Sequence, residues 1–124
     1  MVKYSLRLLW LLFLPVLLHG SMADAQTVVL NRANSGIMDN FIHCFSMIQG
    51  TLAVGTSKGV SFFQGDRWEN WRGGEAGVPD APITAATVFN QQLWVGSGGK
   101  GLARYLDGKW KGFSQANSGL VDDF

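Results

Sequence analysis

Residues 93–113 read LWVGSGGKGLARYLDGKWKGF, and they decide the fold because the same pattern stands earlier in the chain, at 52–71. The earlier copy, LAVGTSKGVSFFQGDRWENW, is one residue shorter in the turn after its first five positions. A flanking stretch also repeats, since ANSGIMDNF at 33–41 returns as ANSGLVDDF at 116–124. A degenerate copy, EAGVPDAPI at 75–83, lies midway. The chain is therefore a tandem repeat in which Gly36, Gly77 and Gly119 mark successive units.

Each repeat predicts four short strands separated by tight turns. The predicted strands are 41–48, 51–56, 60–64 and 68–71 in the first unit and 83–89, 92–97, 102–106 and 109–113 in the second. β-Branched and aromatic residues favour strands, and pairs such as Gln49-Gly50 and Asp107-Gly108 favour two-residue hairpin turns. A period of about 40–45 residues with four strands is typical of a β-propeller blade. We therefore predict an all-β fold of antiparallel propeller blades. A β-sandwich is the alternative, but it needs no fixed repeat.

The segment 1–25 has the pattern of a secretory signal peptide. Lys3 and Arg7 precede an apolar run at 8–18, and the small residues Ala23 and Ala25 follow it. A membrane span needs about 20 apolar residues, and this run is shorter. We expect cleavage after Ala25 and a periplasmic or secreted bacterial protein that meets the membrane only during export.

The rest of the chain divides along the repeat. We assign 26–35 to an outer strand and the loop that leads into the first unit, 36–76 to blade 1, 77–118 to blade 2 and 119–124 to the start of blade 3. A closed propeller has roughly four to eight blades, so we expect an incomplete ring. The missing blades are expected to come from further chain or from other copies. Residues 27–30 are then expected to pair with the last blade of the closed ring.

Composition excludes several classes of function. The 124 residues include 10 Lys and Arg against 9 Asp and Glu, a formal net charge of +1, so the chain lacks the basic excess of a nucleic-acid-binding protein. With 47% hydrophobic and 15% charged residues, it is neither a disordered tail nor a coiled coil. The single cysteine, Cys44, excludes an internal disulfide and a cysteine zinc site. We expect Cys44 to be buried in a strand.

No catalytic constellation is evident from the sequence. His43 and Cys44 are neighbours on a predicted strand, where adjacent side chains point to opposite faces, so they are not expected to share a metal or a reaction. We expect no cofactor, no metal and no enzymatic activity in this chain. Four tryptophans fall at repeat positions, and we expect them to pack between blades; the alternative is stacking on sugar rings. They are Trp68, Trp71, Trp94 and Trp110.

Six polar residues are the candidates for a ligand site. They occupy the loops that lead into each unit and the loops between its second and third strands, which share one rim of a blade. The six are Asp39, Asn40, Ser57, Lys58, Asp80 and Lys100. The aspartates also recur at one repeat position together with Asp122, which favours a structural turn role because Asp side chains bond nearby backbone amides. A ligand or cation role is the alternative.

Taken as one string, the second unit resembles the two-component regulator propeller repeat. The string comprises GVPD at 77–80, LWVGS at 93–97, GL at 101–102, DGKW at 107–110 and NSGL at 117–120. The resemblance covers essentially all of 26–124. It departs from the family pattern at Ala53, where Trp is usual, and at Met38 and Val121, where Pro is usual.

The resemblance implies a sensing function. Such repeats form periplasmic or extracellular domains of bacterial signalling proteins, which recognise a small molecule or carbohydrate and pass a conformational signal inward. The chain contains no kinase motif, phosphate loop or second apolar span, so we expect it to be the N-terminal part of such a sensing domain. The alternatives are a truncated, non-functional remnant and the N-terminal part of a secreted propeller hydrolase or lyase.

Overall fold

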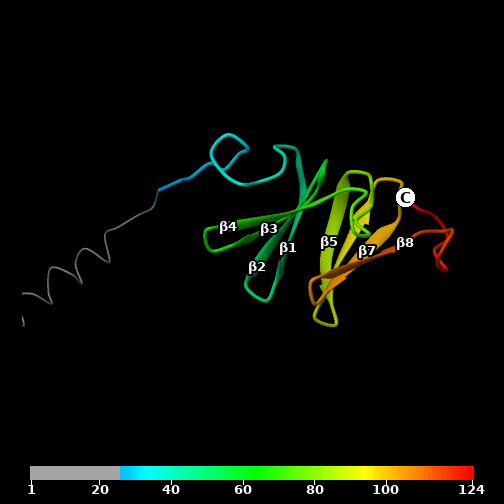
Figure 1. Cartoon of the computed structure of the whole chain (residues 1–124). Coiled ribbons are helices and arrows are strands. Elements are labelled where there is room, and N and C mark those ends of the chain that lie inside the picture. The colour runs from blue at the N-terminus through cyan, green and yellow to red at the C-terminus, as the bar shows by residue number, and fades with distance from the viewer. Residues whose placement is uncertain (1–25) are drawn as a thin grey trace, which may run out of the picture.

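The computed structural model describes residues 26–124 as two antiparallel four-stranded sheets that stand side by side (Figure 1). The first sheet contains β1 (Ile42–Ile48), β2 (Thr51–Thr56), β3 (Gly59–Gln64) and β4 (Arg67–Arg72), paired in chain order. The second contains β5 (Ile83–Phe89), β6 (Gln92–Ser97), β7 (Leu102–Leu106) and β8 (Lys109–Phe113), also in chain order. The predicted all-β class with two four-stranded antiparallel units is confirmed. The predicted signal peptide lies outside the described residues.

Two-residue turns connect the strands within each sheet, except that four residues, 98–101, connect β6 and β7. Three of these turns have positive φ at both central residues, the type I′ geometry whose twist matches that of the flanking strands. The φ values are 47° and 78° at Gln49 and Gly50, 49° and 60° at Asn90 and Gln91, and 50° and 77° at Asp107 and Gly108. Because these turns allow only a direct return, each sheet is a simple up-and-down meander.

The two sheets repeat each other in fine detail. The register of the first strand pair shifts between Ile42 and Cys44 in one sheet and between Ile83 and Ala85 in the other. In each sheet, moreover, the backbone after β2 or β6 bonds back to the residue before the first strand, at 3.1 and 3.0 Å. The sequence repeat is therefore a structural repeat.

The core lies between the facing surfaces of the two sheets. Phe62 of the first sheet is 5% exposed and contacts the edge of Tyr105, with 4.9 Å between ring centroids. It also stacks on Trp110 at 6.1 Å, and Trp71 meets Trp110 edge-on at 6.3 Å. Strand β1 lies against β5. Smaller buried residues complete this core: Ala53, Val60, Val78, Ile83, Leu93, Val95 and Ala103.

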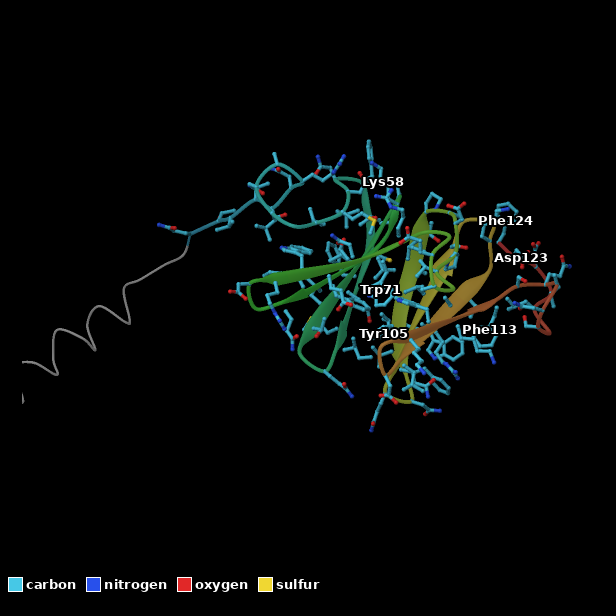
Figure 2. All side chains as sticks on the ribbon, in the orientation of Figure 1. Lys58, Trp71, Tyr105, Phe113, Asp123 and Phe124 are labelled. Atoms are coloured by element: carbon cyan, nitrogen blue, oxygen red, sulfur yellow. The ribbon has the colours of Figure 1, made fainter. Side chains whose placement is uncertain are left out.

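The four tryptophans divide between the core and the outer faces. Trp71 and Trp110 pack between the sheets, as predicted, and Figure 2 shows Trp71 there beside Tyr105. Strand alternation places Trp68 and Trp94 on the outer faces instead. Each stacks on a neighbour within its own sheet, Trp68 on Phe63 and Trp94 on Phe113. Because residues 26–124 form only two sheets, packing of these two tryptophans between blades stays a prediction.

The repeated Asn-Ser pair has a structural role in the connecting loops. The Asn34 side-chain oxygen accepts a hydrogen bond from the Asn31 amide at 2.8 Å, and Asn117 accepts one from the Ser114 amide at 2.7 Å. In both loops the serine hydroxyl donates to a carbonyl four residues earlier. These side chains satisfy backbone groups that have no strand partner, which explains why the pair recurs.

The predicted outer strand is not formed within residues 26–124. Residues 26–30 have no ladder partner there, and Val28 and Val29 are each 70% exposed. A single strand needs a neighbouring edge to satisfy its backbone groups, and this segment pairs with no strand of either sheet. The two sheets do not close into a ring. Pairing of 27–30 with the last blade of a closed ring stays a prediction.

Replacing Phe62 by Ala is expected to lower the free energy of unfolding by about 3–5 kcal/mol, because it opens a cavity between Tyr105 and Trp110. The measurement is urea unfolding followed by tryptophan fluorescence. Phe45→Ala is the matched control, since Phe45 is 60% exposed and its loss should cost below about 1 kcal/mol. Equal losses in the two variants would contradict this placement of the core.

Candidate functional site

Hydrogen bonds between loops bring the six predicted rim residues to one edge of the molecule. The amides of Ser57 and Gly98 donate to the carbonyls of the residues just before β1 and β5, at 3.1 and 3.0 Å. The Gly73 amide donates to the Lys58 carbonyl at 2.8 Å, which ties the β2–β3 turn to the linker between the sheets. Figure 2 shows Lys58 at this upper rim. The structure thus joins the loops that carry the predicted residues.

The carboxylate and amide groups of this rim serve mainly to shape the loops. Asp39 is 4% exposed, and its Oδ1 accepts a hydrogen bond from the Asn40 amide at 2.8 Å. The Asn40 side chain in turn accepts from the Arg32 amide at 2.8 Å. Asp122 holds the Asp123 amide in the same way as Asp39 holds Asn40. These contacts support the structural turn role for Asp39 and Asp122, whereas Asp80 is exposed beside Gly74.

Two exposed lysines sit on turns that buried hydroxyl groups hold in place. The Thr56 hydroxyl donates to the Gly59 carbonyl at 3.0 Å and accepts from the Lys58 amide at 3.1 Å. Ser97 makes the matching bonds in the second sheet, to the Gly101 carbonyl at 2.7 Å and from the Lys100 amide at 3.1 Å. The turn backbones are therefore fixed, while the Lys58 and Lys100 side chains are free to meet a ligand.

A concave feature of the described residues lies at the opposite rim, between the two sheets. It is a cleft of about 710 Å³, a volume within the usual range for small-molecule sites. The β1–β2 turn with parts of β3 and β4 forms one wall, and the β5–β6 and β7–β8 turns form the other. The cleft is lined by Ile48, Gln49, Thr51, Phe62, Gln64, Arg67, Trp68, Glu69, Asn90, Gln91, Tyr105, Leu106, Asp107 and Gly108.

The cleft combines an aromatic ring with charged and amide groups. Tyr105 lies on one wall, and Arg67 and Glu69 lie on the other. Burial, and then the negative charge of Glu69, raise the pKa of the Tyr105 phenol above its usual value. The phenol therefore stays protonated at neutral pH and can both donate and accept hydrogen bonds. Such a lining suits a neutral ligand with several hydroxyl groups.

Sequence reasoning missed this cleft because its residues carry no motif. They come from turns that the repeat predicts correctly, at 49–50, 90–91 and 107–108, but the predicted site used only the loops of the other rim. The signal that could have found the cleft is the same rim argument applied to the other ends of the strands. The pairing of an aromatic residue with an acidic residue across the two sheets, however, depends on how the sheets pack.

His43 and Cys44 are separated, as strand alternation predicts. His43 is exposed, and its Nε2 lies 2.8 Å from the Ser57 hydroxyl. Cys44 is half-buried against the core, and its thiol donates to the Ile83 carbonyl over 3.6 Å. Within residues 26–124, no three His, Cys, Asp or Glu side chains come close enough to hold a metal ion.

No protein family, curated protein or solved structure matches the chain in sequence or fold comparisons. In the part of the chain that the structure describes, no helix has the length and apolar character needed to cross a membrane.

Replacing Cys44 by Ala is expected to reduce the loss of stability at alkaline pH. Burial raises the pKa of the Cys44 thiol above its ordinary value of 9.0. The unfolded chain thus ionises first, and the stabilisation from the neutral buried thiol is lost as the pH rises through and beyond 9.0. The measurement is Tm against pH for the wild type and Cys44→Ala. Ala stands at the matching position of the second sheet, Ala85, so the substitution suits the fold. Parallel curves would contradict the prediction.

Proposed function

We propose that this chain is an exported β-propeller segment that recognises an extracellular carbohydrate or another hydroxyl-rich small molecule. It forms the N-terminal part of the periplasmic or extracellular sensing domain of a bacterial two-component-type signalling protein. The repeat period, the resemblance of the second unit to propeller repeats and the leader pattern at 1–25 support this proposal.

The cleft between the sheets is the observation that carries the proposal. Its walls present a phenol, a guanidinium, carboxylates and side-chain amides around one space. Ligand sites of this size combine aromatic surface with a few polar groups that fix orientation. A sugar offers hydroxyl groups to the polar side chains and an apolar ring face to an aromatic residue, so its chemistry fits this lining.

The position of the cleft also supports a sensing role. Because each wall belongs to a different sheet, a ligand in the cleft contacts both sheets at once. Such a ligand stabilises the packed arrangement of the two sheets relative to any looser one, since it binds only where both walls are in place. Ligand binding thereby makes the packing of neighbouring blades against each other more stable.

Titration with neutral tetrasaccharides tests the proposal. Maltotetraose, cellotetraose and xylotetraose are added separately to the purified chain, with calorimetry and Tm as readouts. At least one is expected to bind and to raise Tm. Tyr105→Phe and Glu69→Gln are each expected to weaken binding about tenfold, because the first removes a hydroxyl group from the cleft and the second replaces a charged acceptor oxygen by an amide donor. Neither variant removes packing volume, so the fold should be retained.

Lysine variants at the opposite rim provide the matched control. Lys58→Ala and Lys100→Ala are expected to leave the affinity unchanged, because both lysines lie outside the cleft. If the loss of affinity instead falls on the lysine variants, the ligand occupies the rim that the sequence predicts and the cleft proposal is wrong. Absence of any binding tighter than about 1 mM across the panel would overturn recognition of neutral carbohydrates.

A further inference from the structure

Each sheet has a second face that takes no part in the contact between the two sheets and carries exposed apolar side chains. On the first sheet, cross-strand pairing aligns Met47, Leu52, Phe63 and Trp68 in one row, with Phe45 beside it; we call this the head face. On the second sheet it aligns Trp94, Arg104 and Lys111, flanked by Phe89 and Phe113; we call this the tail face. Phe45, Met47 and Phe89 are each at least 60% exposed.

The structure already contains one contact between faces of these two kinds. Within the chain, the row Ala53, Phe62 and Glu69 of the first sheet packs on the row Leu93, Tyr105 and Trp110 of the second. The sequence repeat relates the tail face to the first of these rows: Ala53 corresponds to Trp94, Phe62 to Arg104 and Glu69 to Lys111. It relates the head face to the second: Leu93 corresponds to Leu52, Tyr105 to Phe63 and Trp110 to Trp68.

We propose that the tail face of one copy of this chain binds the head face of a second copy, in the geometry of the contact between the two sheets. The tail face occupies the repeat position of a surface that is buried, and the head face that of its partner surface. This inference rests on the repeat and on the internal contact, and it is independent of the ligand proposal.

The substitutions on the two faces are chemically complementary. Arg104 replaces Phe62, which lies between two aromatic rings in the internal contact, so on a second copy the Arg104 guanidinium meets Phe63 and Trp68. A guanidinium over aromatic faces gives a favourable cation–π contact. Arg104 already lies over Trp94 at 5.9 Å, and its Nε is buried without a hydrogen-bond partner. Binding to the head face gives this half-buried cation further aromatic partners.

A second pair of substitutions points the same way. In the internal contact Glu69 lies close enough to Tyr105 to raise the pKa of the phenol. At the corresponding positions, Lys111 carries a positive charge and Phe63 has no hydroxyl group. Lys111 lies 5.2 Å from the ring of Phe113 in the same sheet. A carboxylate near a phenol is therefore replaced by an ammonium group near an aromatic ring that has no hydroxyl group. Both cations of the tail face, Arg104 and Lys111, then meet aromatic rings.

The connecting loop leaves room for this contact. In the second sheet, Gly77 lies so close to Trp110 that a Cβ would come within 3.2 Å of its carbonyl oxygen, and the first sheet still packs on that face. In the first sheet, Gly36 lies against Trp68, where a Cβ would come within 2.7 Å of the side chain. Each loop thus lies beside the tryptophan of the last strand of its sheet, on its backbone in the second sheet and on its side chain in the first, and Phe45 and Met47 of the head face remain 60% exposed.

The symmetry of this contact determines the assembly. A head-to-tail contact is heterologous, so each added copy leaves one free head face and one free tail face until a ring closes. Residues 26–124 of each copy supply two sheets. Rings of the usual propeller size, about four to eight blades, therefore require about two to four copies.

Two exposed phenylalanines allow the contact to be tested without disturbing the core. The full chain, expressed with its own leader and purified, is analysed by sedimentation velocity and native mass spectrometry over a range of concentrations. The wild type is expected to form dimers or larger rings. Phe45→Asp blocks the head face and Phe89→Asp blocks the tail face, so each variant alone is expected to be monomeric. Phe41→Asp is the control, because Phe41 is 72% exposed but lies outside both faces.

Mixing the two blocked variants tests whether the contact is head-to-tail. Phe45→Asp retains a tail face and Phe89→Asp retains a head face, so an equal mixture is expected to form a dimer with one copy of each and nothing larger. A wild type that stays monomeric at every concentration would overturn the proposal. The exposed faces would then need a partner other than a second copy of this chain. Association that survives both variants, or that mixing fails to restore, would overturn the head-to-tail geometry.

Discussion

The packing of Phe62 between Tyr105 and Trp110 is the contact on which the rest of the structure depends. A four-stranded meander has two faces, and the hydrophobic cluster of residues 26–124 lies where one face of each sheet meets the other. The core is the surface that the two sheets share, where apolar burial provides the main driving force for folding. The cleft, the rim and the two outer faces all take their positions from the way the sheets meet at this contact.

The loops add a second constraint that acts through hydrogen bonds rather than apolar burial. Buried hydroxyls of Thr56 and Ser97 fix the β2–β3 and β6–β7 turns, and repeated asparagines hold the loop that leads into each unit. On the upper rim Asp39 and Asn40 likewise accept hydrogen bonds from backbone amides, whereas the Lys58 and Lys100 side chains are exposed. The opposite rim uses backbone-determined turns, so its side chains remain free to line a cleft.

The repeat is regular in backbone but not in the chemistry of its faces. Positions that are apolar or acidic at the contact between the sheets become Trp94, Arg104 and Lys111 on the tail face. If these positions only formed a solvent-exposed surface, small polar residues would be sufficient there. A row that joins cations to an aromatic ring is instead suited to an aromatic surface, which the head face supplies through Phe63 and Trp68.

The sequence alone determined the all-β class, the eight strands nearly to the residue and the turn positions, because strand and turn preferences are local and the repeat reports them twice. It also predicts which loops share an edge, since strand direction decides this. Only the tertiary structure decided that Trp68 and Trp94 face outward, that residues 27–30 find no partner within 26–124 and that Tyr105 and Glu69 share a cleft. These features depend on which sheet faces meet, and the energy that decides this comes from side-chain packing between units rather than from the order of residues within one.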